Sequence, residues 1–186
     1  MLLISLSLRH FRSYSKETFL FSPEVTVIIG PTTAGKSNLI EALFLLATGK
    51  SFKAEKDTQM IQFGNQTGRV IGEIEADGEK EKLEVALAEG GTGTRAYSKR
   101  FFVNGVARRR VDFAGIMPAL LFVPSDLDII VSSPSQRRGF FDTVLEMTDR
   151  QYRLASIAYE KALRHRNALL DLAKEILKKV GKPEEI

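Results

Sequence analysis

The sequence predicts an α/β fold that opens with strands, contains a phosphate-binding loop and ends in a long solitary helix. Three observations support this prediction. An apolar, β-branched run at residues 25–29 leads directly into a glycine-rich loop and then an amphipathic helical pattern. Strand-like runs joined by short turns occupy residues 64–103. A heptad pattern extends over residues 149–180.

Composition restricts the chain to ordinary globular classes. Of its 186 residues, 44% are hydrophobic and 27% are charged, which excludes intrinsic disorder and collagen-like sequence. There is no cysteine, so disulfides, thiolate zinc sites and cysteine nucleophiles are excluded, and two histidines leave little for a histidine-rich metal centre. No apolar run approaches the roughly 18 residues that span a bilayer, and the first residues show no signal pattern. We therefore expect a cytoplasmic protein with no membrane partner.

The net charge is a weak guide to partners. A formal charge of +4 from 27 basic and 23 acidic residues fits nucleic acid, a nucleotide or no anionic partner at all.

Three strand-like runs are expected before the glycine-rich loop, at residues 2–8, 17–21 and 25–29, as a short meander. The third run is β-branched at nearly every position, which is typical of a strand covered on both faces. A helix is expected over residues 38–47. Its apolar positions recur at helical spacing: Leu39, Ala42, Leu43 and Leu46.

Residues 64–103 are expected to form antiparallel strands, because their connections leave no room for crossover helices. We expect strands at residues 70–76, 82–88 and 97–103, with turns at Asp77-Gly78 and residues 90–93. Beyond Arg110 we expect a short helix, an apolar strand at residues 119–123 and a helix at about residues 135–147.

Residues 149–180 are predicted to form one coiled-coil helix that projects from a lobe comprising residues 1–148. With Arg166 allowed at one core position, the apolar residues follow alternating three- and four-residue steps: Tyr152, Ala155, Tyr159, Ala162, Leu169, Ala173, Ile176 and Val180. One narrow apolar stripe needs a partner, and the chain holds no second heptad stretch. We therefore expect a partner from elsewhere or self-association, and a frayed tail at residues 181–186.

A phosphate-binding motif lies at residues 30–37. Gly30, Pro31, Thr32, Thr33, Ala34, Gly35, Lys36 and Ser37 match G-x-x-x-x-G-K-[ST] between a strand and a helix, where the motif belongs. Its glycines let backbone N–H groups converge on phosphate oxygens, and the following helix adds its positive end. We expect Lys36 to reach the β- and γ-phosphates and the Ser37 hydroxyl to ligate Mg²⁺. A glycine-rich turn before a helix is the alternative.

Hydrolysis has further requirements that the sequence meets poorly. An acidic residue at the end of another apolar strand should hold the metal, and a second group should position water. Asp126 is the candidate, but it lies three residues past the strand expected at residues 119–123. The alternative is that Ser125 or Asp126 caps the short helix that follows. We therefore expect ATP to be bound without efficient hydrolysis.

Five further segments occur in the order found in one family of DNA-maintenance ATPases. They are LRHFRSY at residues 8–14, GKSFK at 49–53, FVPSDL at 122–127, SPSQRRGFFD at 133–142 and HRNALL at 165–170. With the phosphate loop, they resemble the N-terminal part of the RecF family of SMC-like, ABC-type ATPases. The resemblance implies a partial ABC-type head of the P-loop NTPase class. An antiparallel β subdomain would lie next to its core, and a coiled-coil arm would follow.

The resemblance also implies a function. RecF proteins are ATP-dependent DNA replication and repair proteins that bind gaps and junctions of single-stranded and duplex DNA, form ATP-dependent homodimers and assist recombinase loading with RecO and RecR. The family's Walker B aspartate, catalytic glutamate and ABC signature belong to a second half that this sequence does not contain. A non-catalytic nucleotide-binding fragment and a small P-loop kinase are the alternatives. The kinase fits less well, because antiparallel hairpins follow the motif where a kinase alternates strand and helix.

Several residue roles follow from the resemblance alone. Arg12 is implied to contact the phosphate or ribose side of the nucleotide, with a surface arginine as the alternative, and Asn38 is implied to join the phosphate cradle. Thr32 and Thr33 replace the Asn and Gly of the usual family loop. Thr33 must therefore adopt the backbone conformation of the loop without the conformational freedom of glycine. Ser125 replaces a residue that is commonly acidic.

Two groups of basic residues are candidates for phosphate contacts. The densest comprises Lys99, Arg100, Arg108, Arg109 and Arg110, which would suit sequence-independent binding of DNA, with solvated loop charge as the alternative. Arg137 and Arg138 stand at a helix start, where they either meet phosphates or hold the head together through carboxylate pairs.

Overall fold

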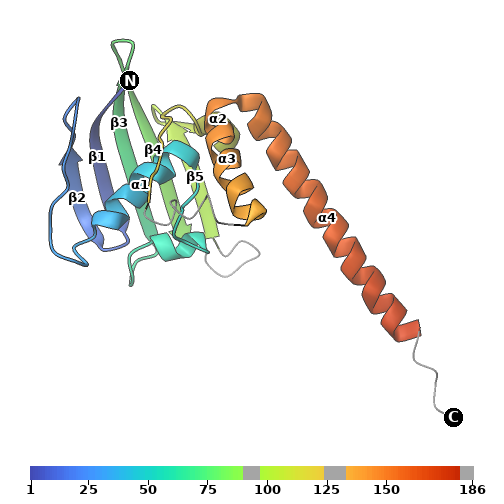
Figure 1. Ribbon diagram of the computed structural model, residues 1–186. Coiled ribbons are helices and arrows are strands. Elements are labelled where there is room, and N and C mark those ends of the chain that lie inside the picture. The colour runs from blue at the N-terminus through green and yellow to red at the C-terminus, as the bar shows by residue number, and fades with distance from the viewer. Residues whose placement is uncertain (90–96, 124–132, 181–186) are drawn as a thin grey trace.

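The computed structural model describes residues 1–89, 97–123 and 133–180. Its strands form one antiparallel sheet in the order β2-β1-β3-β4-β5-β6, with the helix α1 lying across one face (Figure 1). The strands are β1 (Leu2–Phe11), β2 (Tyr14–Leu20), β3 (Thr67–Ala76), β4 (Glu79–Glu89), β5 (Tyr97–Val103) and β6 (Val106–Arg108). The helices are α1 (Lys36–Thr48), the 3₁₀ helix η1 (Asp57–Met60), α2 (Arg110–Phe113), α3 (Pro134–Thr148) and α4 (Arg150–Val180).

Tight turns set the order of the central strands. Asp77 and Gly78 join β3 to β4 with φ values of 52° and 82°, and Asn104 and Gly105 join β5 to β6 with φ values of 50° and 79°. Two successive positive φ angles match the twist of a hairpin, and Asp-Gly and Asn-Gly adopt them readily. The strands predicted at residues 70–76, 82–88 and 97–103 are confirmed as β3, β4 and β5. The turn expected at residues 90–93 lies outside the described residues.

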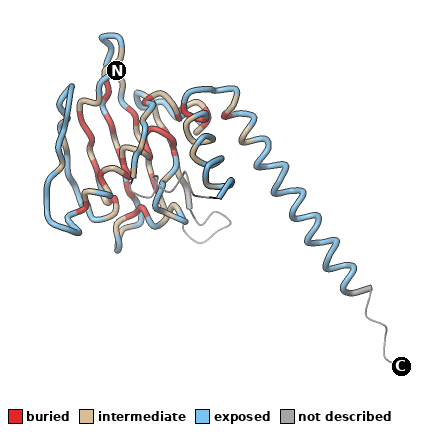
Figure 2. Tube along the Cα trace, viewed as in Figure 1, coloured by how far each residue is buried: buried red, intermediate tan, exposed pale blue. Residues whose placement is uncertain are grey.

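The core lies between α1 and one face of the sheet, where the buried segments concentrate (Figure 2). The sheet contributes Leu6, Leu8, Val70, Ile74, Leu83, Val85 and Leu87, and α1 contributes Leu39, Ala42, Leu45 and Leu46. Gly72 in β3 permits the close approach, because a Cβ there would lie 2.7 Å from Cδ1 of the buried Leu46. The sheet therefore fixes α1, and with it the glycine-rich loop at the start of that helix.

Two predicted strands are not strands in this structure. Residues 25–29 and 119–123 have no assigned strand, and they lie largely exposed. The exposed fractions are 75%, 73% and 88% for Val25, Val27 and Ile29, and 76% and 70% for Leu120 and Phe122. β-branched and apolar residues favour extended backbone, but a strand also needs a neighbour to accept and donate its ladder hydrogen bonds. Residues 25–29 have no such neighbour in the described ranges, so the predicted covering of this segment on both faces was wrong.

The helix expected over residues 149–180 is confirmed as α4, which projects away from the sheet (Figure 1). Only its base packs against α2 and α3. Tyr159, Leu169 and Ile176 of the predicted stripe are exposed, so the coiled-coil pairing remains a prediction. Residues 181–186 lie outside the described residues. Within the part of the chain that the structure describes, no helix is long and apolar enough to cross a membrane.

A buried joint fixes the base of α4. The Arg153 guanidinium donates hydrogen bonds to the carbonyl oxygens of Val111 (2.6 Å), Met147 (3.2 Å) and Glu146. The Glu146 carboxylate in turn accepts bonds from Ser156 (2.8 Å) and Lys50 (3.1 Å). Burial raises the pKa of the Glu146 carboxyl, but these hydrogen bonds and the charges of Lys50 and Arg110 outweigh it, so its pKa lies below its usual value. The joint therefore links α4 to the residues just after α1.

Gly115 is the tightest position in this joint. Its φ is 85°, and a Cβ there would lie 2.2 Å from the Met147 carbonyl oxygen and 2.5 Å from Arg153 Nη2. We expect Gly115→Ala to lower the free energy of unfolding by about 2–4 kcal/mol, from overpacking and from the left-handed conformation together. Urea denaturation measures the change.

Gly78→Ala is the matched control, because Gly78 has a φ of 82° and no atom within 4 Å of the added Cβ. That variant should lose only about 1–2 kcal/mol, the cost of the conformation alone. Equal losses for the two variants would show that the contacts at Gly115 carry no strain.

Candidate nucleotide-binding site

The glycine-rich loop forms a tight wrap immediately before α1. The helix begins at Lys36, and Gly35 before it adopts a φ of 94°. Its carbonyl accepts bonds from the N–H groups of Asn38 (2.8 Å) and Leu39 (3.0 Å). A Cβ at Gly35 would lie 2.7 Å from Ser13 Oγ and 2.9 Å from the Tyr14 hydroxyl. The β1–β2 hairpin therefore presses on the loop, and position 35 needs glycine for both its conformation and its space.

Thr33 adopts the conformation expected from its place in the motif. Its φ is 73°, a left-handed value that a β-branched residue rarely accepts. The Thr33 hydroxyl donates a hydrogen bond to the Thr32 carbonyl at 2.5 Å. This conformation costs about 1–2 kcal/mol relative to glycine.

A hollow of about 340 Å³ opens over the loop, and cations border it. The Lys36 ammonium group donates to the carbonyl oxygens of Gly30 (2.8 Å) and Pro31 (2.7 Å). The lining residues are Thr32, Thr33, Gly35, Lys36, Ser37, Asn38 and Lys53. Lys53 was not predicted as a site residue from the sequence, although its Nζ donates to Asn38 Oδ1 at 3.0 Å. In the sequence, Lys53 was marked only by its place in the GKSFK segment. The distance of that segment from residues 30–37 along the chain does not by itself predict a contact with the loop.

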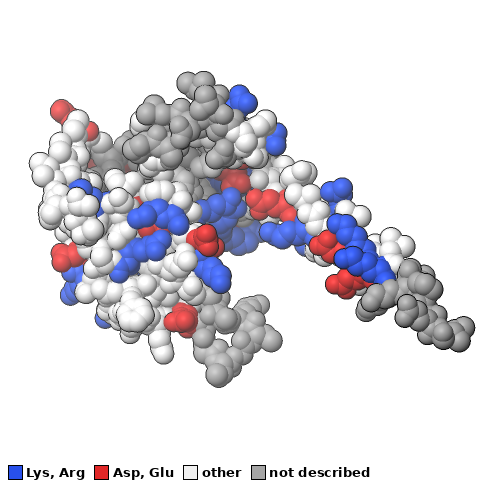
Figure 3. Space-filling view, turned by 60° about the horizontal axis from the view of Figure 1, so that its bottom comes forward, with Lys and Arg blue, Asp and Glu red and all other residues white. Residues whose placement is uncertain are grey.

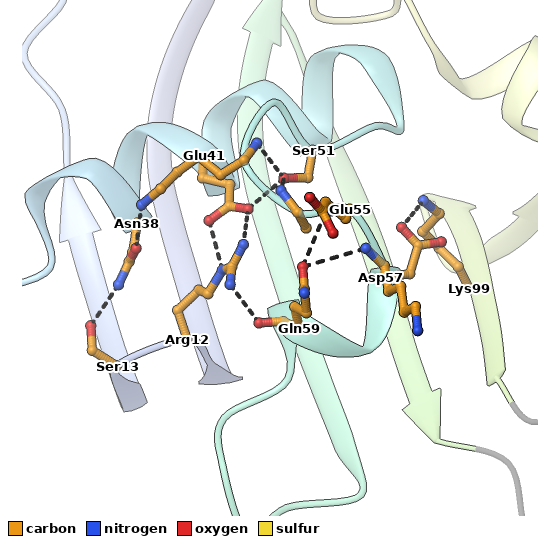
Figure 4. Close-up of polar contacts among 12 residues, drawn as sticks. Arg12, Ser13, Asn38, Glu41, Ser51, Glu55, Asp57, Gln59 and Lys99 are labelled. Atoms are coloured by element: carbon orange, nitrogen blue, oxygen red, sulfur yellow. Dashed lines mark hydrogen bonds and ion pairs between the residues drawn. The ribbon is translucent and has the colours of Figure 1, made fainter.

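Arg12 forms a partly buried ion pair with α1 (Figure 4). Its Nε and Nη2 donate to the two carboxylate oxygens of Glu41 at 2.8 and 2.6 Å, and its Nη1 donates to the Gln59 carbonyl at 2.7 Å. The Glu41 side chain is completely buried and also accepts a bond from Ser51 Oγ at 2.5 Å. Arg12 is therefore not a free surface arginine, and its contact with a nucleotide remains a prediction.

The basic residues predicted to contact DNA do not share one surface. Lys99 lies opposite buried Leu87 on the α1 face of the sheet and pairs with Asp57 at 2.8 Å (Figure 4). Its neighbour Arg100 lies opposite Ala86 on the other face, because successive strand residues alternate.

The arginines of the same sequence cluster are also dispersed. Arg109 pairs with Asp112 at 2.9 Å and Arg110 with Glu146 at 3.4 Å, whereas Arg108 is exposed in β6. Arg137 and Arg138 are exposed on α3. Figure 3 shows Lys and Arg side chains along one face of the head and along α4, with Asp and Glu side chains among them. DNA contact by these residues remains a prediction.

The remaining site predictions concern metal and hydrolysis. Ser37 lines the hollow over the glycine-rich loop, as its expected role as a magnesium ligand requires. Among the described residues, no group of three or more His, Asp or Glu side chains is placed to hold a metal ion. Ser125 and Asp126 lie outside the described residues.

The ion pair predicts a structural role for Arg12 that does not depend on any ligand. We expect Arg12→Ala to lower the free energy of unfolding by about 2–4 kcal/mol, because it leaves the Glu41 carboxylate buried without its partner. Adding Glu41→Gln should recover part of the loss, since a neutral amide is less costly to bury. Urea denaturation of both variants measures this.

Arg9→Ala serves as the control, because Arg9 is an exposed arginine on β1, the strand that ends just before Arg12. It should change stability by no more than about 0.5 kcal/mol. A loss for Arg12→Ala that the second substitution deepens would contradict the role assigned to the pair.

Comparisons with known proteins agree with this architecture. Residues 5–184 match the AAA domain family. The chain is 35% identical over 179 residues to the DNA replication and repair protein RecF of Moorella thermoacetica, and 37% identical over 175 residues to that of Thermosynechococcus vestitus. These matches cover 96% and 93% of the chain but 46% and 44% of the relatives. The chain therefore spans less than half the length of the relatives it matches.

Solved structures show the same correspondence. The recombination mediator protein RecF of the RecFOR pathway, solved with "ATPrS", superposes with a TM-score of 0.83 at 31% identity, covering 98% of this chain and 47% of that one. An SMC ATPase structure superposes with a TM-score of 0.61 at 20% identity, covering 77% of this chain and 99% of that one, which shows a shared fold alone. The fold is that of a P-loop, ABC- and SMC-like ATPase head, as the sequence predicted. The chain belongs to the AAA domain family and corresponds to the N-terminal part of RecF.

Proposed function

We propose that this chain binds ATP with Mg²⁺ as the nucleotide-binding part of a RecF-type DNA replication and repair ATPase. One observation carries the proposal: the glycine-rich wrap, Lys36 and Lys53 border the same hollow at the start of α1. Convergent backbone N–H groups at a helix N-terminus together with two ammonium groups suit a polyphosphate. RecF structures solved with ATP and "ATPrS" share this fold.

The residues present fit both ATP and its metal ion. The Lys36 ammonium group lies over the loop, where it can exchange the Gly30 and Pro31 carbonyls for phosphate oxygens. Ser37 borders the hollow and offers a hydroxyl oxygen, a ligand type that Mg²⁺ accepts beside phosphate oxygens. Bound Mg²⁺ would neutralise phosphate charge. The chain's own residues wrap, orient and hold the triphosphate.

We infer the biological role from the relatives. Those at 35% and 37% identity are DNA replication and repair proteins, which supports a role in DNA replication and repair. The proposal extends, through the family resemblance of the sequence, to ATP-dependent binding of gapped or junction DNA and assistance to recombinase loading with RecO and RecR. An SMC relative by fold undergoes ATP-driven dimerization, which supports an ATP-dependent homodimer. Exposed Arg100 and Arg108 are available to phosphate backbones, although they lie apart from Lys99.

A non-catalytic nucleotide-binding module is the second candidate, and it is compatible with the first. It is favoured because residues 119–123, the apolar run that precedes Asp126 in the sequence, form no strand in this structure. A small P-loop kinase is not supported, because the strands around the loop form an antiparallel sheet.

ATP binding tests the proposal directly. Isothermal titration with Mg·ATP should show binding by the unaltered chain, and Lys36→Ala should weaken it at least about tenfold by removing a charge-assisted phosphate contact. Lys53→Ala should weaken it less, and Lys16→Ala, on exposed β2, should not change it. Turnover by the chain alone should be slow. Unchanged binding by Lys36→Ala would refute the proposed site, and rapid hydrolysis lost in that variant would refute the slow turnover.

The strained loop gives a second prediction. Thr33→Gly should raise the free energy of unfolding by up to about 1 kcal/mol, because the folded loop already holds a φ of 73° and glycine adopts it without the cost of about 1–2 kcal/mol. Thr32→Gly should instead lower the free energy of unfolding by about 0.5–1 kcal/mol, since Thr32 has no positive φ and glycine there only adds freedom to the unfolded chain. Urea denaturation measures both variants, and equal changes for the two would show that Thr33 imposes no strain.

A further inference from the structure

A row of basic side chains crosses five strands of the sheet. In an antiparallel sheet, residues directly opposite each other on neighbouring strands point to the same face. Arg9 in β1 lies opposite Lys16 in β2 on one side and opposite Arg69 in β3 on the other. Arg69 lies opposite Ala86 in β4, and Ala86 lies opposite Arg100 in β5. Lys16, Arg9, Arg69 and Arg100 therefore form one line, the basic row, of which only Arg100 belongs to the cluster predicted from the sequence.

The basic row lies on the face of the sheet that α1 does not cover. Leu8, Val70 and Val85, each next in sequence to a position of the row, are buried in the core beside α1. Because successive strand residues alternate between the two faces, the row points the other way. All four of its basic residues are exposed. In Figure 1, where α1 lies in front of the sheet, this face is turned away from the viewer.

Like charges face one another along the row. Directly opposite residues have Cβ atoms only about 4.5–5.5 Å apart, and like charges at that distance destabilise a sheet. In the ranges that the structure describes, the only row residue with an ion pair is Arg69, which meets Glu84 at 3.1 Å, and its side chain remains 58% exposed. Arg9 faces a cation on each side. An anion bound along the row would remove this repulsion.

We propose that the basic row binds the sugar–phosphate backbone of duplex DNA. The inference rests on the DNA-binding part of the proposed function and names the surface that carries it. Five adjacent strands, at about 4.8 Å per spacing, give a row about 19 Å long. A duplex carries one charge per about 1.7 Å of its axis, so a stiff duplex presents several phosphates to such a row at once. Single-stranded DNA is bound largely by stacking on aromatic rings, and the row contains none.

Acidic side chains border the row on one side. Glu84 lies one step along the strands from the row, opposite Ile71, and Glu73 lies one step further, opposite Lys82. Glu73 is held there by a hydrogen bond from the Ser5 hydroxyl at 3.2 Å. Carboxylates repel phosphates, so the duplex should lie across the strands along the row and not over the part of this face near the β3–β4 turn.

A variant that loses two charges of the row tests the proposal. Arg9→Gln combined with Arg100→Gln should weaken binding of a fluorescently labelled duplex at least about tenfold at low salt. It should also reduce the slope of log K against log salt concentration by about 2, one unit for each lost phosphate contact. Fluorescence anisotropy at several salt concentrations measures both quantities.

Lys80→Gln combined with Lys82→Gln is the matched control. These exposed lysines lie on the same face, toward its acidic end, and the variant loses the same charge. Its affinity for the duplex should change by less than about threefold. Arg9→Lys combined with Arg100→Lys keeps the charge of the row and should retain most of the binding.

The row variant should keep its fold and its nucleotide site. Removing like charges relieves repulsion, so its midpoint of urea denaturation should equal or exceed that of the unaltered chain. Its affinity for Mg·ATP should not change, because neither arginine borders the hollow over the glycine-rich loop. A lower midpoint, with binding lost equally in the lysine variant, would assign the arginines to the fold and refute the proposed surface.

The outcomes distinguish the surface from the nucleotide site. If the unaltered chain binds Mg·ATP but no duplex, or if the row and control variants weaken duplex binding equally, the surface is wrong and nucleotide binding stands. If the row binds duplex while the chain binds no Mg·ATP, the surface stands and nucleotide binding fails. Tighter binding of a single strand of equal length through the same arginines would overturn the choice of duplex. Equal binding of polyglutamate through them would indicate an acidic protein as the partner.

Discussion

The ion pair between Arg12 and the buried carboxylate of Glu41 joins four segments around the candidate site. Arg12 belongs to the β1–β2 turn, Glu41 to α1, Ser51 to the segment after α1 and Gln59 to the 3₁₀ helix η1, and their side chains or carbonyl groups meet at one point (Figure 4). A fully buried carboxylate is costly unless each oxygen has donors, and here three donors reach it. The pair therefore makes the positions of the turn and of η1 depend on the position of α1.

The same helix is held at its other end by the joint with the arm. Gly115 donates to the Ala47 carbonyl at 2.9 Å, and Lys50, two residues beyond α1, pairs with Glu146 of α3 at 3.1 Å. Arg153 of α4 closes the joint by binding carbonyl groups of α2 and of the end of α3. These contacts connect α1, which begins at the glycine-rich loop, to the base of α4. This gives a physical link between the two ends of the molecule.

The sequence predicted the elements that depend on residues close to one another along the chain. Asp77-Gly78 identified a hairpin, alternating apolar residues identified β3 to β5, and the motif at residues 30–37 identified the loop and α1. It failed where structure depends on distant partners. The apolar pattern of residues 25–29 resembles a buried strand, but no neighbouring strand lies beside it in the described ranges. Lys99 and Arg100 are adjacent in sequence and point to opposite faces, whereas Lys53 and Asn38 are 15 residues apart and in contact.

In the glycine-rich loop, the departure from the family pattern at Thr33 is tolerated, whereas a side chain at position 35 would not be. At Gly35 a side chain would meet two obstacles, the φ of 94° and the Ser13 and Tyr14 side chains within 3 Å. At Thr33 there is only one obstacle, the φ of 73°, which costs about 1–2 kcal/mol and can be met by the stability of the surrounding wrap. Within this loop, glycine stands where conformation and space both demand it, and threonine stands at a position where conformation alone favours glycine. The hairpin that crowds Gly35 also leads into Arg12, whose ion pair with Glu41 holds α1, so the same turn shapes the loop and fixes the helix that follows it.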